Sequence, residues 1–324
     1  MRNLNLKPAQ EVENTVEVEI SVVSPVYLAE ACLDELCTRL ENSLSKITSS
    51  YEIVLVEDGS PDGSWGKITT LAQNNPKIVG LRLSRNFGQH QAISAGLKAS
   101  RGKRVVVMDC DLQNPPEEIS VLVKAAEAGN DLVLSRRANR NDPIVAQLGS
   151  RLYHFIVSKL SGNKRDPHIG SFCIMSRQLV TEMLRLKEHH RTLLGMTSFL
   201  GFSPKVIDLP NPPRKIGKSS YSFKRKFVAA TNEFIDYSPR LLYLVVGASF
   251  SLSLVSLVAL IYIVCRALLG QIGVPGWASL IAVILLVGGF LGSVLGVIGL
   301  YIAKVYSEVQ QRPIFVVRDA INLE

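Results

Sequence analysis

Short apolar runs alternate with helix-compatible stretches through the first half of the chain. The apolar runs are rich in Val, Ile and Leu and cover residues 19–27, 51–58, 77–84, 103–109 and 131–136. Helix-compatible stretches follow them over 28–47, 64–74, 88–99, 117–128 and 143–160. Near-continuous apolar strands separated by helices are typical of a mostly parallel sheet covered on both faces. The pattern therefore predicts a Rossmann-like α/β fold, in which ligands bind at the carboxyl ends of the strands.

Two long uncharged runs dominate the last third of the chain. Residues 241–265 and 277–303 contain no Asp, Glu, Lys or Arg. At about 1.5 Å of rise per residue, each run as a helix exceeds the roughly 30 Å hydrocarbon core of a bilayer. The link 266–276 is short and contains Gly and Pro, which favours a tight connection. We predict a hairpin of two transmembrane helices; two buried helices of a globular core are the alternative.

Basic residues gather before the first uncharged run. Residues 201–240 hold eight Lys and Arg against three Asp and Glu, whereas the link holds only Arg266. The positive-inside rule then places the N-terminal part and the tail on the cytoplasmic face of the plasma membrane. No signal peptide is expected in the polar first residues. The expected divisions are a cytosolic sheet domain (1–215), a basic loop and interfacial helix or plain connector helix (216–240), the two spans, and a cytosolic tail (304–324).

Composition narrows the class of protein. The chain has 324 residues, a net charge of +8 and a mean hydropathy of +0.20, and the two uncharged runs explain the positive hydropathy. Residues 1–200 are close to neutral, so no nucleic-acid partner is expected. The five cysteines include no CxxC pair, which indicates neither a disulfide framework nor a zinc site. No GxGxxG follows the first strand and no GxxxxGK[ST] occurs, which argues against dinucleotide and P-loop sites.

Acidic residues stand where the second and fourth predicted strands end. Asp58 ends one strand, and Asp109, Asp111 and Gln113 follow the other. In an extended chain residues two apart point to opposite sides, so a turn at Cys110 is needed to bring both aspartates toward one ion. Hard divalent ions take carboxylate oxygens together with substrate phosphates. A lone Asp-x-Asp also serves turns and helix caps; its combination with Asp58 is the more specific signal.

Four segments carry a family resemblance: SPVYLAE (24–30), VLVEDGSPDGS (54–64), LSRNFGQHQAISAGL (83–97) and MDCDLQNPPEEI (108–119). They resemble the GT-A-fold family-2 glycosyltransferases, and within these the polyisoprenyl-phosphate glycosyltransferases of the GtrB and dolichyl-phosphate mannosyl synthase types. The segment RKIGKSSY (214–221), the two spans and the tail YSEVQQRPIFVV (306–317) extend the likeness over nearly the whole chain.

The resemblance implies a membrane-bound, inverting transfer of a sugar onto a polyisoprenyl phosphate such as undecaprenyl phosphate. It favours UDP-glucose as the donor, with release of UDP, and Mg²⁺ or Mn²⁺ as the cofactor. Mannosyl or amino-sugar transfer is the first alternative. A processive polysaccharide synthase is a second, although its Q-x-x-R-W segment is absent, and a non-catalytic nucleotide-sugar-binding regulator is a third. Membrane lipids are expected partners, as is a homo-oligomer, with a tetramer as one form, because glycines line the second span.

Site residues are carried over from the family motifs position by position. Asp109 and Asp111 are the expected catalytic residues and, with Gln113, the expected metal ligands. The nucleotide-sugar is expected at Pro25, Tyr27, Glu30, Asp58, Arg85, Asp109, Lys218, Ser219 and Tyr221. The acceptor phosphate is expected at Arg136, Arg137, Arg151 and Arg214, because the guanidinium fork suits phosphate. For two residues a plainer role stays open: Arg85 as a surface charge and Asn86 as the cap of helix 88–99.

One position departs from the family pattern. Relatives often read G-D-F-R where this chain has Gly170-Ser171-Phe172-Cys173, so Ser171 stands where an acidic base is frequent. An alcohol acceptor must lose its proton in the transition state and needs such a base. A phosphate monoester has its second pKa near 6 and is already a nucleophilic dianion at pH 7. The missing base therefore favours a lipid-phosphate acceptor; Asp166 is the alternative base.

Overall fold

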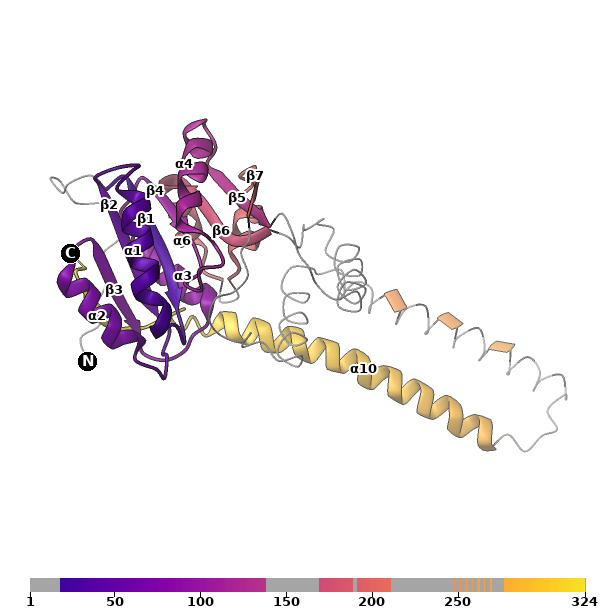
Figure 1. The fold of residues 1–324 in the computed structure, drawn as a ribbon. Helices are drawn as coiled ribbons and strands as arrows, with labels where there is room; N and C mark the ends of the chain where they lie inside the picture. Colours follow the sequence, from indigo (N-terminus) through magenta and orange to yellow (C-terminus); the bar gives the residue numbers. More distant parts are fainter. Residues whose placement is uncertain are drawn as a thin grey trace. The chain divides into compact units, whose positions relative to one another are not determined.

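The computed structural model describes residues 18–137, 169–188, 191–210 and 277–323, with scattered positions between 247 and 269 (Figure 1). The chain divides into two compact units. The first unit is formed by Met1–Ala146, Asp166–Ser220 and Pro313–Glu324, and the second by Gln147–Arg165 and Tyr221–Arg312. The end of the chain, Pro313–Glu324, thus belongs to the first unit.

The first unit is built on an eight-stranded mixed sheet within the described residues, in the order β7-β5-β6-β4-β1-β2-β3-β8. β1 pairs in parallel with both β2 and β4, β2 with β3, and β5 with β7, whereas β6 and β8 run antiparallel to their neighbours. The strands are β1 (Ile20–Val26), β2 (Tyr51–Glu57), β3 (Ile78–Leu83), β4 (Arg104–Val107), β5 (Leu132–Arg137), β6 (Ile169–Ser176), β7 (Lys205–Leu209) and β8 (Val317–Ile321). The α/β class and the five predicted strands are confirmed, and β6, β7 and β8 are additional.

Helices connect the strands as the pattern predicts. The described helices of the first unit are η1 (Glu30–Cys32), α1 (Leu33–Leu44), α2 (Ser64–Asn74), α3 (Gln89–Ala99), η2 (Pro116–Glu118), α4 (Ile119–Glu127), α6 (Arg177–Arg185) and α7 (Leu193–Phe199). The predicted stretches 28–47 and 117–128 each begin with a short 3₁₀ turn before the α-helix. The predicted helix over 143–160 lies outside the described residues.

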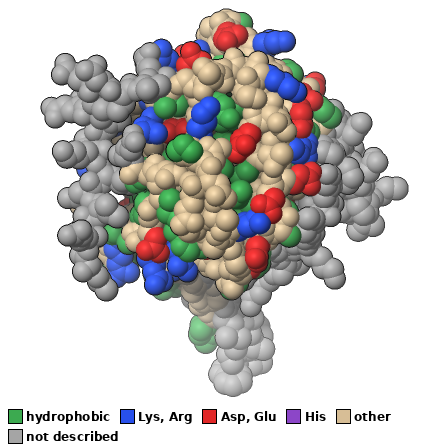
Figure 2. All heavy atoms as spheres, turned by 60° about the vertical axis from the view of Figure 1, so that its left-hand side comes forward, with side chains coloured by type: hydrophobic (Ala, Val, Ile, Leu, Met, Phe, Trp, Pro, Cys, Tyr) green, Lys and Arg blue, Asp and Glu red, His purple; other side chains and the backbone are tan. Residues whose placement is uncertain are grey.

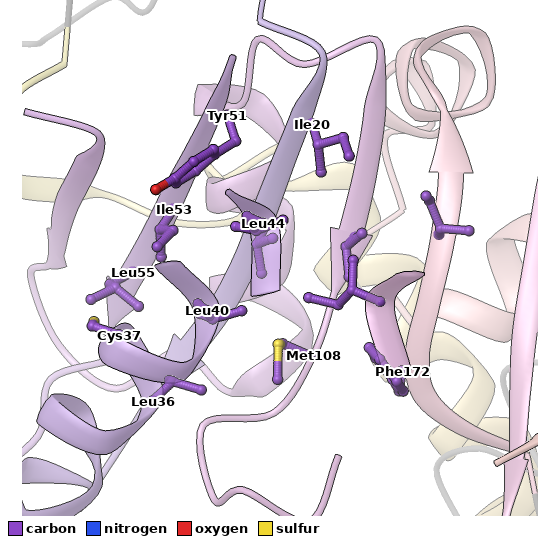
Figure 3. Packing of buried hydrophobic residues seen from close by; sticks show 14 of the residues in the cluster. Ile20, Leu36, Cys37, Leu40, Leu44, Tyr51, Ile53, Leu55, Met108 and Phe172 are labelled. Atoms are coloured by element: carbon purple, nitrogen blue, oxygen red, sulfur yellow. The ribbon is translucent and has the colours of Figure 1, made fainter. Parts of the chain in front are cut away.

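Two apolar cores lie on the two faces of the sheet. Successive strand side chains point to opposite faces, so in β1 Val22 and Val26 join one core and Val23 joins the other. The first core packs α1, α2 and α4 against the sheet, and Figure 3 shows Leu36 and Leu40 of α1 facing it. The second core packs α3, α6 and α7 on the opposite face. Helices therefore pack on both faces of the sheet and bury its apolar side chains, while polar side chains lie at the carboxyl ends of the strands.

The C-terminal strand completes the sheet beside β3. β8 pairs antiparallel with β3, and the backbone N–H of Ser84 donates to the carbonyl of Val316 at 2.9 Å. The side-chain amide of Asn322 donates to the carbonyls of Ala72 and Ile78 at 2.7 and 2.9 Å. Arg82 of β3 lies 3.6 Å from the carboxylate of Asp319. The last residues of the chain are therefore an integral strand of the domain, which the apolar pattern did not predict.

The second unit contains α10 (Trp277–Val309), a 33-residue helix over the second uncharged run. Its segment Val287–Val309 is long and apolar enough to cross a membrane, and it is the one such helix among the described residues. Scattered described positions between Gly247 and Cys265 are helical as well, but most of the first predicted span lies outside the described residues. The two-helix hairpin therefore stays a prediction.

Charged side chains of both signs share the surface. On the face shown in Figure 2, Lys and Arg are interspersed with Asp and Glu, and neither sign gathers into one patch. This mixture agrees with the near-neutral charge of residues 1–200.

Candidate functional site

Two loops at the carboxyl edge of the sheet are tied to each other. The loop after β1 donates from the N–H of Leu28 to the Ser60 hydroxyl at 2.8 Å and from the N–H of Glu30 to Asp62 at 3.3 Å. In return, the N–H of Gly63 donates to Oε2 of Glu30 at 3.0 Å. A Cβ at Gly63 would lie 2.4 Å from Oε1 of Glu30, so a larger residue at position 63 would displace the Glu30 carboxylate from this contact. The Glu30 carboxylate, which was expected to border the nucleoside, is therefore hydrogen-bonded to the backbone of Gly63.

Asp58 is buried where β2 ends and binds the loop that begins α3. Its Oδ1 accepts from the N–H of Phe87 at 2.7 Å, and its Oδ2 accepts from the N–H of Gly88 at 2.9 Å. Burial raises the pKa of this carboxyl, while the two backbone hydrogen bonds and the nearby Arg85 partly oppose the rise. The following residue, Gly59, has φ +62°, and a Cβ there would lie 2.3 Å from the backbone nitrogen of Asn86. Asp58 and Gly59 therefore hold the end of β2 against the loop that follows β3.

Arg85 and Asn86 form the exposed tip of the loop after β3. The guanidinium of Arg85 stacks 4.1 Å from the ring centre of Phe87 and donates to the carbonyl of Asn86 at 3.0 Å. Its positive charge also lowers the pKa of the nearby Asp58 carboxyl. Whether Arg85 contacts a ligand or is a plain surface charge stays a prediction. The cap prediction for Asn86 is wrong: the N-cap of α3 is Gly88, which makes no side-chain cap bond. Asp58 binds the N–H groups at this helix end instead.

Asp109 and Asp111 lie in the turn that follows β4. The turn includes Cys110, as predicted, and continues through Leu112 in the left-handed region at φ +59°. Asp111 accepts from the backbone N–H of Gln113 at 3.2 Å. Both carboxylates are partly exposed, so a ligand can reach them from the carboxyl edge of the sheet.

Two further residues contact Asp109. Its Oδ1 accepts from the side-chain amide of Gln89 at 2.7 Å, and its Oδ2 accepts from the hydroxyl of Ser171 at 2.8 Å. Sequence reasoning considered Ser171 only as a missing base and did not single out Gln89. The antiparallel pairing of β4 with β6, which brings Ser171 here, could not be seen in the apolar pattern.

Tyr27 and Pro25 differ in accessibility. Pro25 is buried within β1, opposite Val56 of β2, whereas the side chain of Tyr27 is 42% exposed. Burial, followed by the charge of Asp109, raises the pKa of the Cys110 thiol to about 12, against a hydrogen bond from the Tyr27 backbone. The backbone of Tyr27 therefore lies beside the Asp109–Asp111 turn, and the residue is partly exposed there.

The donor set suits a hard divalent ion that also binds a phosphate. Two carboxylates, Asp109 and Asp111, follow β4 in one turn, and Mg²⁺ is typically bound by one or two carboxylates plus substrate phosphates and waters. Among the described residues, no group of three or more His, Cys, Asp and Glu side chains could hold a metal. The side-chain contribution of Gln113 stays a prediction.

The predicted acceptor-binding arginines are only partly described. Arg136 is the last but one residue of β5, which pairs with β6, and its guanidinium forms a two-pronged ion pair with Asp208 of β7 at 2.6 and 2.9 Å. Hydrogen bonding from Arg136 lowers the pKa of Asp208. For Arg137 only the backbone is described, in β5. The remaining predicted residues lie outside the described residues: Arg151, Asp166, Arg214, Lys218, Ser219 and Tyr221.

Comparison with known proteins connects this geometry to a family. The profile of glycosyl transferase family 2 matches residues 21–184. A glycosyltransferase of Synechocystis sp. is 32% identical over 95% of this chain and 97% of that protein. The undecaprenyl-phosphate 4-deoxy-4-formamido-L-arabinose transferase of Photorhabdus laumondii is 32% identical over 94% of each chain. A solved structure of glucosyl-3-phosphoglycerate synthase from Mycobacterium tuberculosis aligns with a TM-score of 0.48 at 17% identity, over 67% of this chain and 76% of that chain.

The family profile covers half of the chain, and the relatives cover nearly all of it. The chain therefore belongs to glycosyl transferase family 2 and is a glycosyltransferase.

Proposed function

We propose that this glycosyltransferase is a membrane-bound, inverting enzyme that moves a sugar from a UDP-sugar, with glucose favoured, onto a polyisoprenyl phosphate such as undecaprenyl phosphate. The observation that carries the proposal is the gathering of Asp58, Asp109 and Asp111 at one edge of the sheet. In sheets of this kind ligands bind outside the carboxyl ends of the strands. Relatives that match this chain over 94% and 95% of their own length are named undecaprenyl-phosphate 4-deoxy-4-formamido-L-arabinose transferase.

The donor is proposed to lie along the ends of β1, β2 and β4. Tyr27 offers an exposed aromatic face, Asp58 offers a buried carboxylate, and Arg85 offers an exposed cation next to it. A carboxylate suits the hydroxyl and N–H donors of a nucleoside, and a cation suits its diphosphate. Asp109 and Asp111 would hold the divalent ion, Mg²⁺ or Mn²⁺, which when bound neutralises charge on the diphosphate.

The acceptor is proposed to reach the site as a phosphate dianion. One of its oxygens forms a bond to the anomeric carbon while the bond from that carbon to UDP breaks, and the electron pair leaves with UDP. A single displacement of this kind inverts the anomeric centre. No proton has to be removed from the nucleophile, so Ser171 in place of an acid is no obstacle. Arg136, on the strand next to Ser171, is the described candidate for the phosphate.

The connectivity of the chain supports the membrane hairpin. The chain leaves the sheet after β7 at Leu209 and rejoins it as β8 at Val317. If α10 crosses the bilayer once, the sheet can stay on one side only when residues 211–276 contain an odd number of further crossings. The uncharged run 241–265 supplies one such crossing. Two spans, with the sheet on the cytoplasmic face, are therefore proposed.

The test is incubation of membranes that contain the chain with a panel of labelled UDP- and GDP-sugars and undecaprenyl phosphate. We expect label in the lipid fraction with one UDP-sugar and no label without the chain. An amino-sugar donor is the second candidate, because several relatives are named as 4-deoxy-4-formamido-L-arabinose transferases. Binding of a UDP-sugar without any transfer would instead favour a non-catalytic regulator.

A further inference from the structure

Three elements that are distant in sequence meet at one carboxylate. Asp109 follows β4, Gln89 is the first residue of α3, and Ser171 is the third residue of β6. The Gln89 amide donates to one oxygen of Asp109 at 2.7 Å and the Ser171 hydroxyl donates to the other at 2.8 Å. Both distances are those of good hydrogen bonds to a charged acceptor. Each oxygen of this carboxylate is therefore oriented by a separate neutral donor.

The surrounding backbone fixes where the two donors stand. β6 runs antiparallel to β4 with Cys173 opposite Val107, and continuing that register by two residues sets Ser171 opposite Asp109. Gln89 directly follows Gly88, whose N–H is held by Asp58 at 2.9 Å. The start of α3 thus bridges the carboxylates at the ends of β2 and β4. Neither donor needs to move for both bonds to exist.

We propose that Gln89 and Ser171 are positioning residues that hold Asp109 in the orientation in which it binds the metal-diphosphate part of the donor. The inference rests on the proposed function, since it takes Asp109 as a donor-site residue. A carboxylate bound on both oxygens loses rotational freedom before the ligand arrives, so less entropy is lost on binding. Serine at position 171 acts here as a hydrogen-bond donor, whereas an acid would set a second negative charge against Asp109.

The experiment measures the dissociation constant of UDP in the presence of saturating Mn²⁺ by calorimetry on the purified full-length chain. Ser171→Ala and Gln89→Ala are each expected to weaken UDP binding roughly 10-fold, the order of a lost hydrogen bond to a charged group. Ser171→Thr keeps the hydroxyl and is expected to restore most of the affinity. The matched controls are Ser45→Ala and Gln73→Ala, at exposed positions of α1's end and α2, which should bind as the unmodified chain does.

A double-mutant cycle separates positioning from general damage to the fold. In an Asp109→Ala background the acceptor of both bonds is gone, so adding Ser171→Ala should change UDP affinity less than 2-fold. Equal losses of affinity with and without Asp109 would overturn the proposal, as would full affinity in both single variants. An Ser171→Asp variant with a raised kcat would also overturn it, because position 171 would then serve a base. If the unmodified chain fails to bind UDP with Mn²⁺, the proposed donor itself is wrong and this inference falls with it.

Discussion

The two edges of the same sheet differ in how far their carboxylates are exposed. At the amino edge Glu52 is 2% exposed and accepts from the Ser21 hydroxyl at 2.6 Å and from Arg101, through its backbone N–H at 2.6 Å and its Nε at 3.0 Å. The N–H of Gly102 donates to Ser21 at 2.7 Å, and its carbonyl accepts twice from Arg177. The polar groups at this edge thus form a network in which they hydrogen-bond to one another.

The carboxyl edge is open by comparison. Leu28 and Leu112 adopt left-handed backbone conformations that non-glycine residues rarely take, and Leu28 is 53% exposed. Asp109 and Asp111 are partly exposed and lie in a turn rather than a strand. Closed networks stabilise a fold, whereas strain and exposed charge gather at functional sites. Substitutions at the amino edge should therefore change stability alone, whereas substitutions at the carboxyl edge that touch the donor site should change activity, with or without a change in stability.

The largest effect is expected from Asp111→Asn at the carboxyl edge. Loss of the charge that holds the ion on the diphosphate should reduce sugar transfer roughly 10²–10³-fold. Thermal unfolding of the purified chain and its insertion into membranes should stay unchanged. An Asp111→Asn chain that transfers sugar at the normal rate would remove Asp111 from the site.

At the amino edge, Glu52→Ala should cost about 2 kcal/mol of unfolding free energy, because it leaves the buried Ser21 hydroxyl and the backbone N–H of Arg101 without their acceptor. The measurement is thermal unfolding in detergent, paired with the transfer rate per folded molecule. That rate should match the unmodified chain. A fall in the rate without a loss of stability would contradict the division between the two edges.

Two glycines provide a matched pair across the sheet. A Cβ at Gly59 would lie 2.3 Å from the backbone of Asn86, and a Cβ at Gly102 would lie 2.5 Å from the backbone of Ser21. Each substitution to alanine should cost about 2 kcal/mol through overpacking or backbone strain. Gly59→Ala should in addition raise the KM for the donor, since it displaces the Arg85 loop. Equal KM values in the two variants would show that this loop does not contact the donor.

A gain in stability is expected from Leu28→Asn. Leu28 has φ +52°, and asparagine tolerates the left-handed region at a lower cost than leucine. The variant should gain about 1 kcal/mol in thermal unfolding. If the donor contacts the Leu28 side chain, the rate of sugar transfer will fall at the same time. An unchanged stability would show that the left-handed conformation of Leu28 costs no free energy.

The smallest effect is expected at Glu117, which pairs with Arg39 of α1 through two bonds at 2.9 and 2.7 Å. Hydrogen bonding from Arg39 lowers the pKa of Glu117 below its ordinary value. The pair therefore stabilises the fold at neutral pH and loses its contribution as the pH falls through that lowered pKa. Because Glu117 is 55% exposed, Glu117→Gln should cost less than about 1 kcal/mol at pH 7. The difference from the unmodified chain should vanish in acid.

The sequence predicted the parts of the fold that rest on local periodicity. The strands around Asp58 and Asp109, and helices α2 and α3, appear within one or two residues of the expected bounds. β6, β7 and β8 were missed, because their pairing depends on contacts between residues far apart in sequence. β8 follows a membrane-type helix, where the apolar pattern gives no hint of a return to the sheet.

The candidate site was predictable to the extent that motif residues mark strand ends. Asp58, Arg85 and the Asp109–Asp111 turn lie at the expected edge of the sheet. The partners that orient them, Gln89 and Ser171, follow from tertiary pairing and could not be read from spacing. The sequence also could not show that Arg136 forms an ion pair with Asp208.

The most direct test of the account compares two acceptors that differ only in the phosphate. The purified full-length chain is given the labelled UDP-sugar that the panel identifies, with either undecaprenyl phosphate or undecaprenol. A phosphate dianion needs no base, whereas an alcohol must lose its proton, and position 171 carries serine where an acidic base is frequent. Label should therefore enter the phosphate lipid and not the alcohol. Transfer to undecaprenol, or no transfer to undecaprenyl phosphate from any sugar of the panel, would contradict the account.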